Sequence, residues 1–227
     1  MSHPEVSVIV PMRDAARFID DALDSIVGQR DIAPGTLEVI VVDNGSTDDS
    51  VARVERRRDR RVRLLSEPQR GAAAARNLGI AGASGRYLAF LDADDRWRPA
   101  KLAPQITALE RDAGADLVFG HFVTIDHSGR PLGDAPAPAF SLGTLLARRD
   151  SFSRVGPLTT RFEVGEFIDW FTRAEDAGLR HLMLADVMLE RRVHQTNTTA
   201  HRAARADYAR VVRLAVRRRG LLGDDSR

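Results

Sequence analysis

The sequence predicts an α/β fold in which crossover helices flank a mostly parallel central sheet. Short apolar runs of strand length alternate with helical segments through the first half of the chain. These runs are continuous rather than alternating, which is typical of strands covered on both faces. One of them, residues 87–91, ends abruptly at Asp92, Asp94 and Asp95. Such sheets bind ligands beyond the carboxyl ends of their strands, so a functional site is expected at this edge.

The elements of the first half follow from local pattern. Apolar runs indicate strands, and apolar residues three and four positions apart, such as Ala22 and Ile26, indicate helices. Ser46 or Thr47 is suitably placed to cap the second helix. The expected elements are strand 6–10, helix 15–29, strand 37–42, helix 46–58, strand 62–65, helix 71–81, strand 87–91, helix 101–112 and strand 116–119.

The second half of the chain has a less regular pattern. Residues 127–130 indicate a hairpin turn. The other expected elements are strand 144–148, helix 152–156, helix 165–177, strands 180–184 and 187–193, and an amphipathic helix over 203–219. No internal repeat and no clear linker divides the 227 residues, so a single domain, 1–227, is expected.

Composition excludes several classes of protein. The chain is 43% hydrophobic and 29% charged, which is normal for a folded domain. It lacks cysteine, so disulfides, thiolate–metal sites and a cysteine nucleophile are excluded. No run of 18 apolar residues and no secretory signal is recognised, so no transmembrane helix and a cytoplasmic location are expected.

The basic character of the chain does not indicate a nucleic-acid partner. The sequence pI is about 9.6 although the net charge is only +2, because nearly all basic residues are arginines that stay charged. Basic clusters at 56–61 and 217–219 are interpreted as solvated helix faces. The basic terminal helix leaves open a peripheral contact with the inner face of a membrane.

The three carboxylates after residue 91 have two interpretations. Clustered like charges raise the cost of ionisation, and a divalent cation removes that cost. Mn²⁺ or Mg²⁺ prefers oxygen ligands and usually takes one or two carboxylates plus substrate phosphates. The alternative is an acidic turn, since aspartate is common in turns. Asp43, which ends strand 37–42, can face the same crevice.

Several motifs together resemble one family. In order they are Val8-Ile9-Val10-Pro11, Ala22-Leu23-Asp24-Ser25-Ile26-Val27-Gly28-Gln29, Val41-Val42-Asp43-Asn44-Gly45-Ser46-Thr47-Asp48, Gly71 with Ala75-Arg76-Asn77, and Phe90-Leu91-Asp92-Ala93-Asp94-Asp95. This series resembles glycosyltransferase family 2, whose members have the GT-A fold, a Rossmann-like fold that binds nucleotide sugars. The resemblance covers residues 6–98 and continues more weakly through 148–149, 155–156, 165–170 and 194–198.

The resemblance implies an inverting, metal-dependent transfer of a sugar from a nucleoside diphosphate sugar, UDP- or dTDP-linked. Residues 6–98 would bind the donor, 99–199 the acceptor, and 200–227 would form the terminal helix. The acceptor, whether a glycan, a lipid-linked molecule or a peptide, is not indicated. The implied donor-binding residues are Pro11, Arg13, Asp14, Asp43, Arg76, Asp92 and Ala93. Asp94, Asp92 and His194 are the implied ligands of Mn²⁺ or Mg²⁺, and Asp95 is a further candidate.

The family often places its catalytic base in a Glu-Asp pair at the start of a helix. Here the second acid of the pair is replaced by Phe167. Glu166 and Asp169 are three residues apart and share a helix face, so either is a candidate base. Asp169 is favoured slightly because Trp170 beside it resembles the family's aromatic acceptor platform. Alternatively, both acids only stabilise the helix N-terminus.

Three other classes of protein share part of this pattern. A haloacid-dehalogenase-type phosphatase also uses Asp-x-Asp, but after its first strand, whereas the motif here follows the fourth. A nucleotidyltransferase of similar fold has a glycine-rich basic loop after its first strand, and residues 11–14 are not one. A sugar-nucleotide-binding protein with impaired catalysis would keep Asp43 and Asp94 and lose the base, which the presence of Phe167 leaves open.

Overall fold

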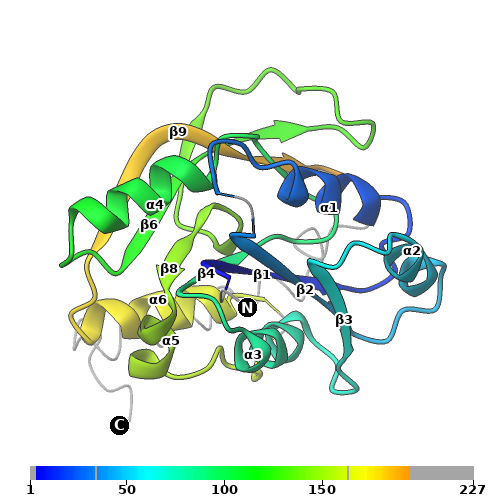
Figure 1. The fold of residues 1–227 in the computed structure, drawn as a ribbon, viewed down its shortest axis with the longest axis horizontal. Coiled ribbons are helices and arrows are strands. Elements are labelled where there is room, and N and C mark those ends of the chain that lie inside the picture. Colours follow the sequence, from blue (N-terminus) through cyan, green and yellow to red (C-terminus); the bar gives the residue numbers. More distant parts are fainter. Residues whose placement is uncertain (1–3, 34, 163, 195–227) are drawn as a thin grey trace, which may run out of the picture.

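The computed structural model describes residues 4–33, 35–162 and 164–194, and its first half alternates strands and helices as predicted (Figure 1). The expected terminal helix 203–219 and residues 195–198 lie outside these ranges. The elements of the first half are β1 (Val6–Met12), α1 (Ile19–Val27), β2 (Leu37–Asp43), α2 (Ser50–Arg56), β3 (Val62–Ser66), α3 (Ala72–Gly82), β4 (Tyr87–Phe90), β5 (Arg96–Trp97) and α4 (Leu102–Arg111).

The second half adds antiparallel strands to the sheet. Its elements are β6 (Leu117–Ile125), β7 (Ala137–Ala139), the 3₁₀ turn η1 (Leu142–Thr144), β8 (Leu146–Arg148), α5 (Arg149–Val155), α6 (Glu166–Asp176) and β9 (His181–Arg192). The strand order is β3-β2-β1-β4-β8-β6-β9-β5, and β7 pairs with β6. The longest ladders, β1–β2, β2–β3 and β6–β9, are parallel, which confirms the predicted α/β fold class.

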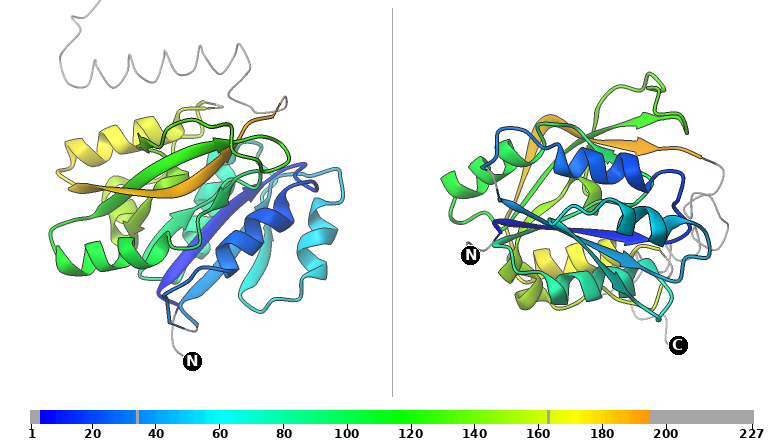
Figure 2. Two further views of the ribbon diagram at one scale, coloured as in Figure 1. Left: turned by 90° about the horizontal axis from the view of Figure 1, so that it is seen from above. Right: turned by 45° about the vertical axis from the view of Figure 1, so that its right-hand side comes forward.

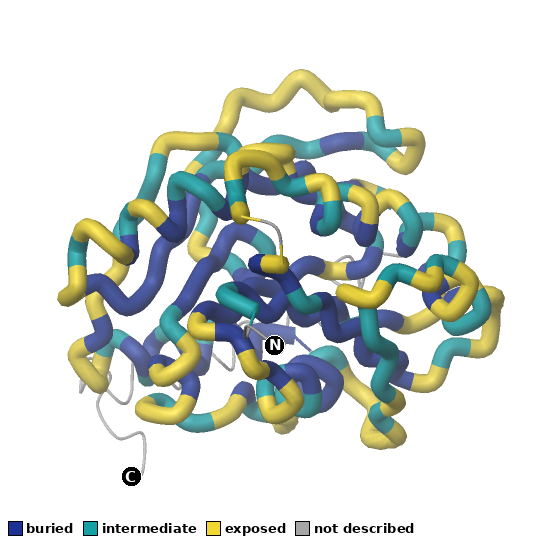
Figure 3. The backbone as a smooth tube through the Cα atoms, viewed as in Figure 1, coloured by how far each residue is buried: buried dark blue, intermediate teal, exposed yellow. Residues whose placement is uncertain are grey.

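Helices cover both faces of the sheet (Figure 2). Helices α1 and α4 pack with β1, β2 and β4 into one apolar core, and α3, α5 and α6 form the second core on the other face. In Figure 3 the buried residues gather in the interior, and the exposed residues lie mainly in the outer loops and helix ends. Helix α3 lies so close to β1 at Gly79 that a Cβ added to this glycine would come within 2.5 Å of Ile9 Cγ2.

The first strand is longer than predicted, and its end explains how it tolerates a proline. Strand β1 was expected to end at Val10 but continues to Met12. The pairing of β1 with β4 ends at Ile9. The backbone of Pro11 faces the same side as that of Ile9 but lies beyond the end of this pairing. The N–H that proline lacks is therefore not needed for a hydrogen bond between the strands. The extension brings Met12 opposite Asp43 at the end of β2.

The predicted strands 180–184 and 187–193 form one strand, β9. The two predicted strands are separated by Ala185 and the exposed Asp186. Strand β9 instead continues through Ala185 and Asp186, and the register of its pairing with β6 shifts on either side of His121. Such an irregularity absorbs extra residues without ending the strand.

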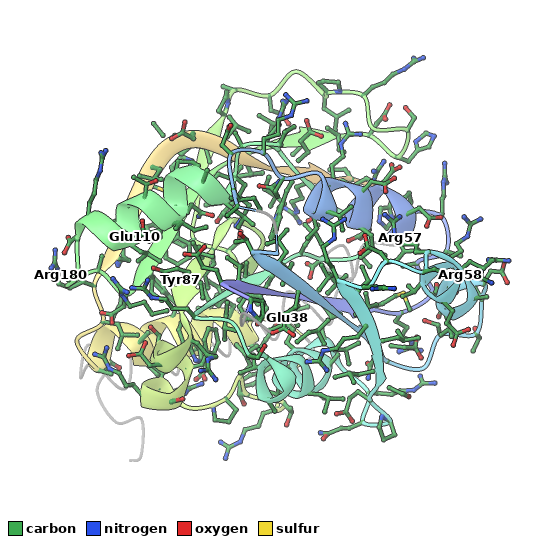
Figure 4. All side chains as sticks on the ribbon, in the orientation of Figure 1. Glu38, Arg57, Arg58, Tyr87, Glu110 and Arg180 are labelled. Carbon is green, nitrogen blue, oxygen red and sulfur yellow. The ribbon has the colours of Figure 1, made fainter. Side chains whose placement is uncertain are left out.

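The basic cluster at residues 56–61 lies at the end of α2, where Figure 4 shows Arg57 and Arg58 near the outer edge of the molecule. Arg56 forms an ion pair with Asp49, Arg57 contacts Asp20 and Asp24, and Arg61 pairs with Asp59. The interpretation as a solvated face fits the exposed Arg56, Arg58 and Arg60, whereas Arg57, with a side chain that is only 17% exposed, joins the end of α2 to α1. Among the described residues, no helix has the length and apolar character needed to cross a membrane.

The only lysine of the chain, Lys101, is fully buried at the start of α4. Its Nζ donates hydrogen bonds to Gln105 Oε1 at 2.8 Å and to the Leu145 carbonyl at 3.1 Å. The Trp97 ring lies 4.2 Å from Nζ. These contacts only partly replace water, and burial lowers the pKa of Lys101 well below its usual value of 10.5.

This depressed pKa predicts a pH-dependent stability. Between the lowered pKa of Lys101 in the folded protein and its usual value of 10.5, the unfolded chain binds more protons at this side chain than the folded protein does. The free energy of unfolding therefore rises as pH increases through that window. Each pH unit contributes at most about 1.4 kcal/mol. We expect the difference in unfolding free energy between wild type and Lys101→Met, measured in urea at pH 7 and 9.5, to move in favour of the wild type at pH 9.5. An unchanged difference would contradict the lowered pKa of Lys101.

Candidate functional site

The loops that follow β1 and β2 are joined by hydrogen bonds at the carboxyl edge of the sheet. Asp14, with φ of 47°, accepts from the Thr47 N–H at 2.7 Å, and its own N–H donates to Ser46 Oγ at 3.0 Å. The N–H groups of Ala15 and Ala16 donate to side chains of the second loop, Ser50 Oγ and Asp48 Oδ2.

The structure corrects two predictions about the helices. Helix α1 begins at Ile19 rather than residue 15, because residues 16–18 form a turn in which the N–H groups of Phe18 and Ile19 both donate to the Ala15 carbonyl. Ser46 and Thr47 do not cap α2, which begins at Ser50, because both bind Asp14 instead. The exposed Arg13 lies 3.8 Å from the same Asp14 carboxylate.

Two side chains at the end of β2 organise this edge further. The Asp43 carboxylate is buried and accepts long hydrogen bonds, of 3.2 to 3.4 Å, from the N–H groups of Gly45 and Ser46. Asn44 accepts from the Gly71 N–H at 2.8 Å and donates to the carbonyls of Glu67 and Gln69. Hydrogen bonds therefore join the loops after β1, β2 and β3 to one another.

The acidic run after β4 forms a tight turn, in which the Asp95 N–H donates to the Asp92 carbonyl at 3.0 Å. Burial and the charge of Asp92 raise the pKa of Asp94, although His194 opposes the shift. Burial and both neighbouring acids raise the pKa of Asp95 well above its usual value. Clustering thus makes ionisation costly, as predicted.

Asp94 and Asp95 have different surroundings. The carboxylate of Asp95 is buried and accepts the backbone N–H of Arg192 at 2.7 Å, so it supports the turn. Asp94 Oδ2 lies 2.9 Å from His194 Nε2, and about a third of the Asp94 side chain is exposed. The structure therefore brings together two of the three predicted metal ligands, Asp94 and His194.

The third predicted ligand, Asp92, contacts an arginine. Arg76 in α3 is 6% exposed, and its Nη2 donates to Asp92 Oδ1 at 2.5 Å while its Nη1 donates to Glu166 Oε1. Burial alone would lower the pKa of Arg76, but Asp92, Glu166 and Asp94 outweigh it and raise the pKa. Its Nε–H has no hydrogen-bond partner within the described residues. Arg76 thus links the acidic turn to the start of α6.

The two candidate bases lie in the first turn of α6 but face different partners. Asp169 Oδ2 accepts from Arg173 Nε at 2.9 Å. Arg173 also donates to the carbonyls of Val155 and Pro157, so this pair ties α6 to the end of α5. Glu166, which binds Arg76, is the acid of the two that is linked to the acidic turn.

The aromatic residues of α6 are core residues. Trp170 is 0% exposed, stacks on Phe152 with ring centroids 4.2 Å apart and donates its Nε1–H to the Gly156 carbonyl. The prediction that Trp170 offers an acceptor platform is therefore wrong, because α6 turns this ring into the core beneath it. Phe167 is also buried and packs near Phe119, Trp170 and Phe171.

The remaining predicted donor residues, Pro11 and Ala93, lie at the same edge, at the end of β1 and inside the acidic turn. Two residues outside the predicted site, Phe18 and Arg192, contact the predicted ligands His194 and Asp94. A signal for Arg192 exists in the sequence, since two adjacent arginines lie at residues 191–192, at the end of a predicted strand.

The Asp94–His194 pair has the chemistry of a partial metal site. Within the described ranges, no group of three or more histidine or acidic side chains is placed to hold an ion. Mn²⁺ and Mg²⁺ commonly complete their coordination with water and substrate phosphates, so two protein ligands suffice for such an ion. A carboxylate suits both ions, while a nitrogen ligand favours the transition metal, Mn²⁺.

Comparison with known proteins gives a consistent result. The family profile described as Glycosyl transferase family 2 matches residues 7–164. The UDP-Glc:alpha-D-GlcNAc-diphosphoundecaprenol beta-1,3-glucosyltransferase WfgD of Escherichia coli is 34% identical over 124 residues, which are 54% of this chain and 47% of WfgD. The chain spans 19% to 51% of the length of the curated relatives compared.

Two solved structures share the fold. The mannosyltransferase PcManGT from Pyrobaculum calidifontis, in complex with GDP-Man and Mn²⁺, has a TM-score of 0.77 at 25% identity and covers 96% of this chain and 65% of its own. TarS of S. aureus, in complex with UDP-GlcNAc, has a TM-score of 0.79 at 19% identity, with 93% of this chain and 65% of TarS covered. Both similarities agree with the predicted GT-A fold.

Proposed function

Because this chain belongs to glycosyltransferase family 2, we propose that it transfers a sugar from a nucleoside diphosphate sugar to an acceptor hydroxyl with inversion at the anomeric carbon. The observation that carries the proposal is the meeting of Asp94 and His194 at the carboxyl edge of the sheet, beside the Arg76–Asp92 pair. This edge is where open α/β sheets bind nucleotides.

The donor's diphosphate would be bound through Asp94, His194 and a divalent ion, Mn²⁺ in preference to Mg²⁺. When bound, the ion would supply Lewis-acid stabilisation of the negative charge that develops on the departing nucleoside diphosphate. The raised pKa of Asp94 supports this role, because an added cation offsets the repulsion that its carboxylate experiences from Asp92. Asp92, about half exposed beside Arg76, is free to contact the ribose.

Asp43 would select the nucleobase. A carboxylate offers only acceptors, which matches the N3–H of uracil or thymine. The hydrogen bonds from Gly45 and Ser46 are long and leave the two oxygens with unused acceptor capacity. UDP- and dTDP-linked donors are therefore proposed. The UDP-Glc in the name of WfgD agrees with this choice, whereas GDP-Man is bound in the PcManGT structure.

Glu166 would act as the general base. An inverting transfer needs a carboxylate that takes the proton of the acceptor hydroxyl as its oxygen attacks the anomeric carbon. Glu166 is linked through Arg76 to the acidic turn, whereas Asp169 is committed to Arg173 at the α5–α6 junction. In the donor-free protein, Arg76 holds the Glu166 carboxylate. The incoming diphosphate would compete for the same guanidinium and release Glu166 for catalysis.

A nucleotide panel tests the donor assignment. We expect UDP or dTDP with Mn²⁺ to raise the melting temperature more than GDP or CDP, because Asp43 accepts from the imide N–H of uracil or thymine. Omitting Mn²⁺ should remove most of the shift. Asp43→Asn is the matched control, since it keeps the side-chain shape and should weaken the preference. A larger shift with GDP, or equal shifts with and without metal, would contradict the donor or metal assignment.

A further inference from the structure

We propose that Phe18 and Arg192 are positioning residues that hold His194 and Asp94 in the geometry needed to bind the metal–diphosphate. The inference rests on the proposed function and extends it to two side chains that touch neither the donor nor the ion. Both residues connect three parts of the chain: the start of α1, the acidic turn and the end of β9.

Arg192 is the anchor of this arrangement. It is 1% exposed, and its Nε donates to the backbone carbonyl of Asp94 at 2.8 Å. Its Nη1 donates to the His127 carbonyl at 3.1 Å, and its Nη2 pairs with Asp21 Oδ2 at 3.1 Å. Its backbone N–H binds the Asp95 carboxylate. One buried side chain therefore fixes both the main chain of the acidic turn and the strand that leads to His194.

Phe18 extends the anchor to the imidazole of His194. The Phe18 and His194 rings are stacked, with centroids 5.0 Å apart and an interplanar angle of 26°. The Arg192 guanidinium carbon lies 5.0 Å from the centroid of the same Phe18 ring. Metal-binding histidines usually gain their orientation from a second contact on the ring. Here the stacked contact with Phe18 restricts the tilt of the imidazole, while Asp94 holds Nε2.

The short strand β5 reinforces the same junction. Arg96 and Trp97 pair with Glu190 and Leu189 of β9 directly after the acidic turn. The carboxylate of Glu190 also forms ion pairs with the side chains of Arg96 and Arg98. The segment after the turn and the end of β9 are thus joined close to Asp94 and His194. This leaves Arg192 and Phe18 to set the final positions of the two ligands.

Neither side chain has a close chemical substitute. The guanidinium of Arg192 uses three nitrogens toward three different acceptors, and a lysine ammonium on a longer flexible stem cannot reproduce that planar fork. Leucine in place of Phe18 keeps an apolar side chain at the start of α1 but removes the flat face that contacts the imidazole. Phe18→Leu and Arg192→Lys therefore test orientation with small changes in volume and charge.

The experiment measures nucleotide binding by calorimetry as a function of Mn²⁺ concentration, together with binding of the same nucleotide without metal. UDP is the probe, with dTDP and GDP as further arms. For Phe18→Leu and Arg192→Lys we expect about a 10-fold rise in the Mn²⁺ concentration that half-maximally enhances binding, the lower end of the effect of residues that orient metal ligands. Metal-free affinity should stay near that of the wild type. Arg17→Gln is the matched control, because the exposed Arg17 lies 5.4 Å from the same ring and has no hydrogen bond to the acidic turn within the described residues.

The outcomes distinguish a failure of the proposed function from a failure of the roles proposed for Phe18 and Arg192. A wild type that shows no Mn²⁺-enhanced binding of any of the three nucleotides overturns the proposed function and this inference with it. A wild type that responds to Mn²⁺, with Phe18→Leu indistinguishable from it, overturns the inference alone. Equal loss of metal-free and metal-dependent affinity in Phe18→Leu assigns the residue to the nucleotide pocket and also overturns it. If Arg192→Lys does not fold, Phe18→Leu still decides.

Discussion

Replacing Asp94 by alanine is expected to abolish the Mn²⁺-dependent part of nucleotide binding and to lower turnover by roughly 10²- to 10³-fold, in line with the several kcal/mol that a Lewis acid contributes to charge stabilisation. The fold should survive, because the Asp94 side chain is partly exposed and the main chain of the turn is held by Arg192 and by the Asp95 N–H. Calorimetric titration of UDP with and without Mn²⁺, and the initial rate of transfer, measure the two effects.

The matched control for this change is Asp95→Asn in the same turn. Asparagine keeps an oxygen that accepts the Arg192 N–H, so the turn should keep its shape while one buried acid is removed. We expect Asp95→Asn to retain Mn²⁺-dependent binding. Should Asp95→Asn lose that binding while Asp94→Ala keeps it, the metal ligand would be Asp95, and the Asp94–His194 contact would be a hydrogen bond of structural importance only.

The second large effect is expected from Glu166→Gln, which should lower turnover by about 10²- to 10⁴-fold, the range for loss of a general base. Glutamine keeps the length and hydrogen-bonding shape of the side chain but cannot accept the proton of the acceptor hydroxyl. Donor binding should not weaken, because Glu166 competes with the diphosphate for Arg76 and a neutral glutamine binds the guanidinium less strongly. Turnover at saturating donor and acceptor, compared with the affinity for UDP, separates the chemical step from binding.

Asp169→Asn is the matched change on the same helix turn. It weakens the ion pair with Arg173 that joins α6 to α5, so we expect a lower melting temperature and a smaller loss of turnover than in Glu166→Gln. The reverse ranking of turnover would assign the base to Asp169. If both variants keep wild-type turnover while the wild type is active, neither acid is the base and the pair has a structural role.

Local sequence pattern was enough to predict the order of the main elements. Continuous apolar runs such as residues 39–42 and 87–90 become buried strands, because a strand covered on both faces has no polar side. The carboxyl ends of parallel strands lie on one edge, so the pattern also predicted where Asp43 and Asp92 would be found. Element ends were less predictable. They depend on partners elsewhere, as when β9 continues through residues 185 and 186 beside β6.

The candidate site could likewise be predicted only in part from the sequence. The sequence singled out Asp94, His194, Arg76 and Glu166 as candidate site residues, and the family motifs supplied their order. The sequence could not say which acid is linked to the acidic turn, because Glu166 and Asp169 share a helix face in any helix of this register. The partners differ only in the folded chain, where Arg76 reaches Glu166 across 90 positions and Arg173 occupies Asp169.

What the sequence by itself determined is therefore the α/β fold class, the family and the types of residue at the sheet edge, because each is written in local periodicity and in motifs of adjacent residues. Only the tertiary structure decided that Trp170 belongs to the core and that Phe18 contacts both His194 and Arg192. The physical reason is separation along the chain. Contacts such as Asp94 with His194, 100 positions apart, form only when the sheet aligns the ends of distant strands.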